Sequence, residues 1–297
     1  MQSSPTFQLP LFKQNDLKRV VNVASVPFRS PFRYPGGKTW LVPRIRQWLL
    51  SRPVKPELLI EPFAGGGIVG LTAAFESLAE HVILVERDPC VAAVWKSILG
   101  KDGEWLANRI VTFDLTAQSV DTALESEANT TRDLAFQTIL RNRINRGGIL
   151  ADGAGRVKHG ENGKGLTSRW YPATLRQRIL DIVQIRQRLT FIEGDGIQVM
   201  RENTADVDAC FFIDPPYTAA GKRAGSRLYT HSELDHAQLF SVAATVRGDF
   251  LMTYDNAADV EMMARQYNFD CESVAMKNTH HTRMTELLIG PNLAWLR

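Results

Sequence analysis

Four consecutive residues have side chains or carbonyls that could perform chemistry at the end of a strand: Asp214, Pro215, Pro216 and Tyr217. The residues before them, 211–213, are bulky and apolar, as expected for a short buried strand. Proline has no backbone N–H and cannot extend a sheet ladder, so the strand should end there. The pattern predicts a carboxylate, rigid carbonyls and an aromatic ring at a strand end, where open α/β sheets bind ligands.

A glycine-rich turn between a strand and a helix predicts a nucleotide site. Residues 61–67 read Glu-Pro-Phe-Ala-Gly-Gly-Gly, follow a predicted strand at 57–60 and precede a predicted helix at 71–78. Glycine permits close approach of the backbone to a ligand. Phe63, Gly65 and Gly67 form an FxGxG pattern, which differs from the GxGxxG fingerprint of dinucleotide-binding proteins.

Acidic residues follow two further predicted strands. Glu86 ends the strand at 81–85, about 20 residues after the glycine-rich turn, where a carboxylate suits hydrogen bonds to two ribose hydroxyls. Asp88 is the neighbouring candidate, and a solvated strand-end acid is the alternative. Asp195 follows the strand at 190–193 and could accept a hydrogen bond from an adenine amino group. For Asp195 the alternative is an ordinary Asp-Gly turn.

A second glycine loop lies upstream of the first. Gly36, Gly37 and Lys38 lead into a predicted helix at 39–50, so backbone amides and an ammonium group could approach an anionic group. A loop with a surface lysine is the alternative. The GxxxxGK[ST] spacing of a phosphate-binding P-loop is absent from this stretch.

Strands and helices cease to alternate between residues 102 and 189, which predicts an inserted, mainly helical domain. Basic residues far outnumber acidic ones between Arg141 and Arg188, and residues 147–165 are rich in glycine. This composition suits a loop that follows a phosphate backbone, although a solvated charged face is the alternative. The candidate DNA-binding residues are Arg141, Arg143, Asn145, Arg146, Lys158, Lys164 and Arg169.

The composition predicts one large α/β unit with an insertion. The chain has 297 residues, 44% of them hydrophobic, and a formal net charge of +3. We expect an N-terminal arm at 1–30, a sheet-bearing core at 31–101 and 190–297, and the insertion at 102–189. No apolar run reaches the roughly 18 residues of a membrane span and no signal peptide is evident, so we expect a cytoplasmic protein. The cysteines are isolated, and no zinc or other metal pattern is expected.

These motifs occur in the order found in a known family, and from Pro31 onward the chain resembles it. Residues 35–38 resemble its N-terminal cofactor motif, residues 61–67 its Glu-Pro-Phe-x-Gly-x-Gly loop, and residues 214–217 its DPPY motif. Glu86 stands where relatives usually have Asp, and Tyr34 where they often have Trp. The chain is similar to Dam-like adenine-N6 DNA methyltransferases, the alpha group of the D12 class. The basic insertion resembles the family's recognition hairpin only loosely, so the target sequence is not transferable.

The resemblance implies a Rossmann-like S-adenosylmethionine-dependent methyltransferase that acts on double-stranded DNA, with the insertion as its recognition domain. It assigns catalysis to Asp214, Pro215, Pro216 and Tyr217, and the stacking of a base extruded from the duplex to Tyr217. A cognate restriction endonuclease or other defence component is a candidate partner, and we expect a monomer or weak dimer. The implied cofactor contacts are Tyr34, Lys38, Phe63, Gly65, Glu86, Asp195 and Asp214.

Three alternatives stay open at this point. Cytosine-N4 methylation uses the same amine chemistry, although its enzymes more often have Ser before Pro-Pro-Tyr. Methylation of RNA adenine or of protein glutamine is less favoured, because glutamine enzymes usually carry Asn in that position. A non-catalytic DNA-binding protein with a relict fold is disfavoured by the intact Lys38, Glu86 and Asp214.

Overall fold

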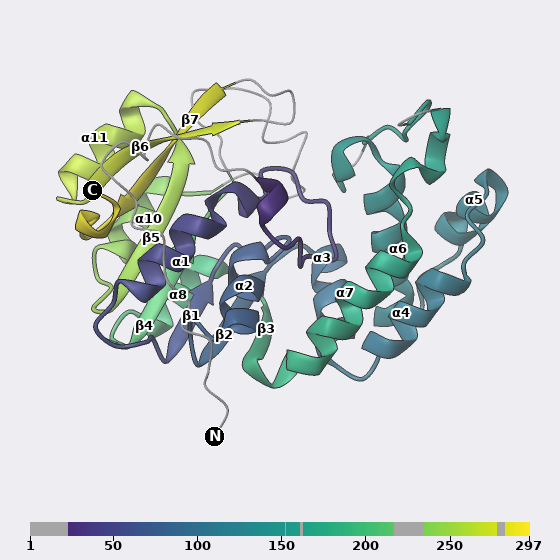
Figure 1. Ribbon diagram of the computed structural model, residues 1–297, viewed down its shortest axis with the longest axis horizontal. Coiled ribbons are helices and arrows are strands. Elements are labelled where there is room, and N and C mark those ends of the chain that lie inside the picture. Colours follow the sequence, from purple (N-terminus) through teal and green to yellow (C-terminus); the bar gives the residue numbers. More distant parts are fainter. Residues whose placement is uncertain (1–22, 152, 161–162, 217–233, 278–282) are drawn as a thin grey trace.

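The computed structural model describes residues 23–151, 153–160, 163–216, 234–277 and 283–297. It contains a sheet flanked by helices and, beside it, a group of helices from the middle of the chain (Figure 1). Within the described parts of the chain, no helix is long and apolar enough to cross a membrane.

The sheet has seven strands in the order β3-β2-β1-β4-β5-β7-β6. The first five run parallel to their neighbours, and β7 is antiparallel to both β5 and β6. The order 3-2-1-4-5 is that of a Rossmann-like sheet, whose ligand crevice opens where the strand order reverses, beside β1 and β4. The strand bounds are β1 (Leu58–Glu61), β2 (His81–Glu86), β3 (Leu189–Glu193), β4 (Ala209–Ile213), β5 (Asp249–Asp255), β6 (Asp270–Lys277) and β7 (Arg283–Gly290).

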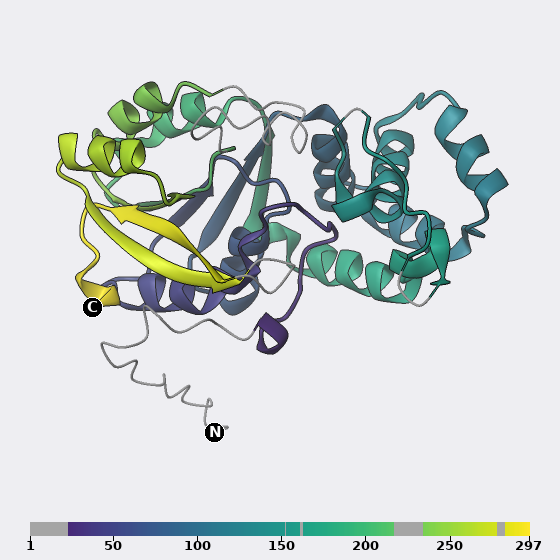
Figure 2. The same ribbon diagram turned by 90° about the horizontal axis from the view of Figure 1, so that it is seen from above.

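Helices cover both faces of the sheet, as Figure 2 shows from above. Successive strand residues point to opposite faces, so Leu59 packs in one apolar cluster and Ile60 in the other. Because both faces are buried, the central strands are apolar throughout, and β4 is buried along its whole length. One face is covered by α1 (Val42–Leu50), α2 (Ile68–Glu76) and α3 (Pro89–Leu99), and the other by α8 (Gly196–Asn203), α10 (His236–Ala243) and α11 (Ala258–Gln266).

The expected insertion contains four helices in its described residues: α4 (Gly103–Thr112), α5 (Ala117–Glu125), α6 (Thr131–Ile144) and α7 (Pro172–Ile185). They lie to one side of the sheet in both views (Figures 1 and 2), and α6 packs against α3. Helices α5 and α6 begin at Thr116 and Thr130, whose hydroxyls accept hydrogen bonds from backbone N–H groups in the first turn. The expected boundaries, 102 and 189, fall beside the start of α4 and the start of β3.

Two local expectations differ from the structure. Ser30 belongs to the expected N-terminal arm, yet it is buried, and its hydroxyl donates a hydrogen bond of 2.5 Å to the carbonyl oxygen of Gly66. Strand β6 was not expected, because it is an edge strand of mixed polarity that is held by its antiparallel pairing with β7. The N-cap of α10 is Asp235, whose carboxylate accepts from the N–H of Gln238.

Candidate active site

A cavity of about 550 Å³ opens at the carboxyl ends of the parallel strands. Glu61 ends β1, Glu86 ends β2 and Asp214 follows β4, and all three carboxyl-bearing residues line this cavity. The loop at 33–40 closes another side of it. A volume of several hundred Å³ with a few convergent polar groups is typical of a small-molecule site. The cavity lies at the reversal of strand order that the fold predicts for ligand binding.

A buried ammonium group stands between two carboxylates at one end of the cavity. Lys38 Nζ lies 2.9 Å from Asp214 Oδ1 and 3.6 Å from Glu286 Oε2, and it donates to the carbonyl oxygen of Gly36 at 3.0 Å. The Lys38 side chain is only 2% exposed. The hydroxyl of Thr253 also donates to Asp214 Oδ1, at 2.7 Å. Two donors from separate elements therefore fix the orientation of the Asp214 carboxylate.

Three of the cavity carboxyl groups bind protons more tightly than usual, because burial raises the pKa of Glu61, Glu86 and Glu286. Burial raises the pKa of Glu286 to about 7; the Lys38 charge opposes this, and the Asp214 and Asp255 charges add to it. Burial likewise raises the pKa of Glu61 to about 8, against a hydrogen bond from the backbone N–H of Gly70 at 2.7 Å. The cavity therefore concentrates acidic groups around one ammonium, and its charge changes near neutral pH.

The glycine-rich turn lies between an aromatic ring and an acid. The backbone N–H of Gly65 donates to Glu86 Oε2 at 3.0 Å, and the other oxygen of this carboxylate accepts from the N–H groups of Arg87 and Asp88. Gly65 has a φ of +47°, and a Cβ there would come within 2.5 Å of the Tyr34 ring. Only glycine lets the turn pass under this ring.

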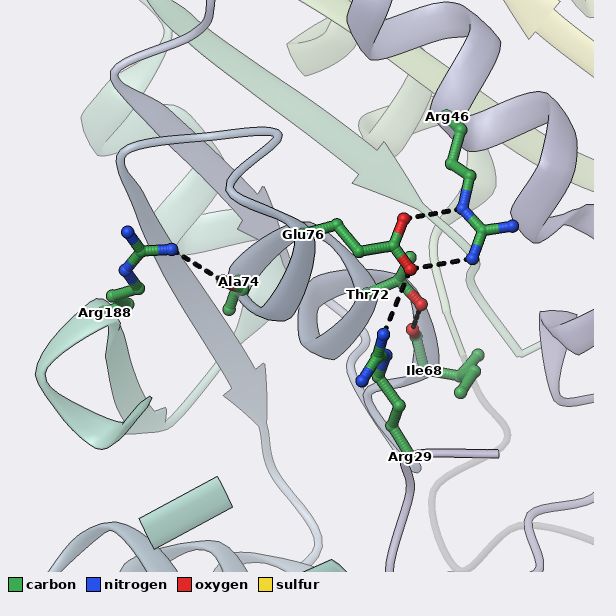
Figure 3. A network of polar contacts seen from close by, with 7 residues as sticks. All are labelled: Arg29, Arg46, Ile68, Thr72, Ala74, Glu76 and Arg188. Carbon is green, nitrogen blue, oxygen red and sulfur yellow. Dashed lines mark hydrogen bonds and ion pairs between the residues drawn. The ribbon is translucent and has the colours of Figure 1, made fainter. Parts of the chain in front are cut away.

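A network of ion pairs holds the segment before residue 34 against the sheet-side helices. In Figure 3, the Glu76 carboxylate of α2 accepts from both Arg46 of α1 and Arg29. The Arg46 bonds are 2.6 and 2.7 Å long, in the bidentate geometry that makes arginine–carboxylate pairs strong. Arg188 caps the end of α2 by donating to the carbonyl oxygen of Ala74. The loop that closes the cavity is thus anchored near its start.

The insertion is tied to the same loop by one amide side chain. Asn142, at the end of α6, is fully buried; its Oδ1 accepts from the N–H of Arg33 and its Nδ2 donates to the Arg33 carbonyl oxygen. The Nδ2 group also donates to the carbonyl oxygen of Gly148, at 2.8 Å. This pairing places Gly147 of the insertion in the wall of the cavity. The insertion and the cavity loop therefore form one packed unit at this point.

Most of the predicted cofactor residues meet in the cavity, whose lining includes Tyr34, Lys38, Phe63, Glu86, Asp214, Pro215 and Pro216. Gly65 is not in the lining, because the Tyr34 ring covers it. Asp195 is also outside the lining, and its carboxylate caps α8 by accepting from the N–H of Gln198. Its assignment to the cofactor stays a prediction. Tyr217 lies outside the described residues.

The predicted DNA-binding residues divide into three sets. Arg146, Lys158 and Lys164 are exposed, and Arg141 and Arg169 are partly buried. Arg143 and Asn145 are 3% and 8% exposed, so neither lies on an open charged face, and their contact with DNA stays a prediction. Arg143 donates to the Pro31 carbonyl oxygen, and Asn145 donates to that of Ile149 at 2.8 Å. Sequence could not reveal this burial, because α6 packs on several sides at once and its charges follow no single helical stripe.

Three residues of the site were not assigned from sequence. Glu61 begins the glycine-loop motif, and its position directly after a strand was an available signal. Glu286 and Thr253 gave no local signal, since each lies within a predicted strand and reaches Lys38 or Asp214 only through the sheet. Among the described residues, no group of three or more His, Cys, Asp or Glu side chains could hold a metal ion.

The chemistry of the cavity fits an S-adenosylmethionine molecule. The indole N–H of Trp40 is buried without a hydrogen-bond partner, Glu286 Oε2 is buried with only the 3.6 Å ion pair to Lys38, and both residues line the cavity. A buried donor without a partner in a polar cavity is a group that a polar ligand would satisfy. The surplus of carboxyl groups suits a ligand that carries an ammonium and a sulfonium, and Glu86 stands where ribose hydroxyls would need an acceptor.

The sheet order is Rossmann-like, and the cavity lies where such a sheet binds its ligand. Residues 34–133 match the family model described as D12 class N6 adenine-specific DNA methyltransferase, which confirms the family resemblance over that part of the chain. The match includes the cavity loop, the glycine-rich turn and Glu86, and it ends before Asp214. No curated protein sequence is similar to the chain.

Solved structures with a similar course of the chain include two nucleic-acid enzymes. A proposed RNA methyltransferase from Pyrococcus horikoshii has 10% identity and a TM-score of 0.40, with 92% of each chain covered. The rRNA methyltransferase aviRa from Streptomyces viridochromogenes has 15% identity and a TM-score of 0.38, with 95% of this chain and 94% of that chain covered. Structural similarity at this level does not indicate the substrate of this chain.

Proposed function

We propose that this methyltransferase transfers a methyl group from S-adenosylmethionine to the N6 amino group of adenine in double-stranded DNA. One observation carries the proposal: Asp214, the acid of the DPPY motif, is joined to Lys38 of the family-matched loop inside a single cavity. The adenine and DNA specificity rests on the family match.

The residues around Asp214 suit an exocyclic amine as substrate. Such an amine is a poor nucleophile, because its lone pair is delocalised into the base. Asp214 and the Pro215 carbonyl could accept its hydrogen bonds and favour a tetrahedral nitrogen. Lys38 and Thr253 hold the carboxylate in place before the substrate arrives. The contribution of these residues is positioning and electrostatic preorganisation.

The cofactor would be held by the other walls of the cavity. Glu86 would accept from the ribose hydroxyls, the Tyr34 and Phe63 rings would contact the adenosine, and Glu286 would face the methionine ammonium. When bound, S-adenosylmethionine supplies an electrophilic methyl group on a sulfonium. The acidic surroundings favour this cation over the neutral thioether product, so they would assist product release.

The duplex would lie across the insertion and the mouth of the cavity. Arg146, Lys158 and Lys164 are exposed there and can contact phosphates, and the target base would be extruded into the cavity. The position of Gly147 in the cavity wall supports this arrangement, because it brings the insertion to the place where an extruded base would enter.

The test uses isotopically labelled cofactor with unmethylated genomic DNA, followed by mapping of the modified bases by sequencing. We expect N6-methyladenine at a defined sequence, and loss of transfer in Asp214→Ala with DNA binding largely retained. Asp235→Asn is the matched control, because this residue caps α10 and asparagine is also a good cap. Modification of cytosine would establish the N4 alternative, and transfer to RNA alone would refute the proposal.

A further inference from the structure

Four arginines meet where the cavity loop joins the insertion: Arg33, Arg143, Arg169 and Arg178, which we name the arginine cluster. Arg33 belongs to the cavity loop, Arg143 to α6, and Arg178 to α7. The guanidinium of Arg178 lies 4.6 Å from the centre of the Phe28 ring, and Phe28 lines the cavity. The cluster therefore sits directly behind one wall of the candidate active site.

Two members of the cluster have buried nitrogen atoms that are unused as donors. Arg143 is 3% exposed; one of its NH₂ groups donates to the Pro31 carbonyl oxygen, but its Nε has no hydrogen-bond partner. Arg33 Nη1 is also buried without a partner. A buried donor that is left unpaired costs about 1–3 kcal/mol, and more when it carries charge. The charge of Arg33 acts on Arg143, so both unused donors lie in one positively charged region where an acceptor would be stabilised.

Two members of the cluster, Arg33 and Arg143, have no ion pair with a carboxylate among the described residues. Burial, followed by the charges of Arg178, Arg33 and Arg169, lowers the pKa of Arg143. Elsewhere in the chain, partly buried arginines form ion pairs with carboxylates: Arg46 with Glu76, and Arg52 with Asp249.

We propose that the arginine cluster binds a phosphodiester group of the DNA backbone, beside the nucleotide whose base enters the cavity. A phosphodiester brings a negative charge and several acceptor oxygens, which guanidinium groups bind in a bidentate manner. Arg33 is partly exposed and lines the cavity, which gives the anion access to the cluster. The proposal rests on the proposed function only in taking DNA as the ligand.

The first experiment measures anion-dependent stability with inorganic phosphate as the probe. The melting temperature of the full chain is compared in a few millimolar phosphate and in chloride of equal ionic strength. We expect phosphate to stabilise the wild type, and to stabilise Arg178→Gln by less than half as much. Arg176→Gln is the matched control: it removes an equal charge from an exposed position of the same helix, so its phosphate response should equal that of the wild type.

The second experiment measures DNA affinity as a function of salt. We expect Arg178→Gln and Arg33→Gln each to weaken duplex binding by about tenfold and to reduce the slope of log K against log salt by about one. Cofactor affinity should be unchanged in Arg178→Gln, because Arg178 does not line the cavity.

The outcomes separate the two proposals. An equal phosphate response in all variants, or a phosphate response with an unchanged DNA salt slope, would overturn the arginine-cluster proposal. A reduced DNA slope in a chain that transfers no methyl group to DNA would uphold the cluster as a DNA phosphate site and refute the proposed function. Binding of RNA but not DNA would overturn both.

Discussion

Lys38 Nζ and Asp214 Oδ1 lie 2.9 Å apart, and this ion pair joins the loop before α1 to the residue after β4. The two residues come from motifs that are distant in sequence, one inside the family-matched segment and one beyond it. Because Lys38 is almost fully buried, the ion pair is held in a poorly hydrated environment where its orientation is well defined. The loop that would hold the cofactor therefore also positions the candidate catalytic acid.

This ion pair predicts that Lys38→Met impairs turnover more than it impairs folding. Without the ammonium, the Asp214 carboxylate loses one of its two fixed donors and faces Glu286 without an intervening cation. We expect the rate of methyl transfer to fall by about 100-fold, a loss typical of a misplaced catalytic group. Single-turnover rates and cofactor titration would measure it.

The matched control for Lys38 is Lys96→Met, which removes an exposed ion pair with Glu193 on the protein surface. Surface pairs contribute little, so transfer by this variant should equal that of the wild type. Wild-type turnover in Lys38→Met would show that the buried ion pair does not position Asp214.

The raised pKa of Glu286 predicts how stability changes with pH. Its pKa is about 7 in the folded chain against an ordinary value of 4.5, so the folded state holds the proton more tightly than the unfolded state. This contribution is fully present below pH 4.5 and is lost as the pH rises through 7. The variant Glu286→Gln has no titrating carboxyl group at this position. Between pH 4.5 and pH 7, its free energy of unfolding should therefore fall less than that of the wild type, by about 1 kcal/mol.

Urea unfolding of the cofactor-free chain at several pH values would measure this difference. Glu202→Gln is the control, because this side chain is exposed on α8, and its curve should run parallel to that of the wild type. If Glu286→Gln also runs parallel to the wild type, the buried carboxyl group does not titrate in this range.

The strand-end acids could be found from sequence because their signal is local. An apolar run followed by Glu86, or by Asp214 and two prolines, predicts both the strand and the place where it ends, and parallel strands bring such ends together. Glu286 could not be found in this way. It lies inside β7, and only the antiparallel pairing of β7 with β5 brings it to Lys38.

Residue type alone also could not show which basic side chains of the insertion are buried. Arg143 carries the charge expected of a DNA contact, but its helix is packed between α3 and the cavity loop, and its side chain is buried. The structural role of Asn142 could not be predicted, because an amide that binds the backbone of a segment distant in the chain follows no sequence pattern. Long-range polar contacts of this kind depend on the packing of whole elements.

The contact between the insertion and the cavity loop predicts an unusual sensitivity at Gly148. This residue has a φ of +78°, and a Cβ there would come within 2.2 Å of the Arg33 carbonyl oxygen. Gly153 has a φ of +79°, but a Cβ there would meet nothing within 4 Å. Alanine at either position costs about 1–2 kcal/mol of left-handed strain, so a comparison of the two variants isolates the close approach to Arg33.

We expect Gly148→Ala to lose about 2 kcal/mol more stability than Gly153→Ala, because backbone must move to relieve the overlap. The displacement of Arg33 would also move Tyr34 and Lys38, which line the cavity. Gly148→Ala should therefore bind the cofactor more weakly than the wild type, whereas Gly153→Ala should bind it with wild-type affinity. Urea unfolding and cofactor titration of both variants would measure these effects. Equal losses of stability and equal cofactor affinities would mean that the insertion can shift at Gly148 without moving the loop that closes the cavity.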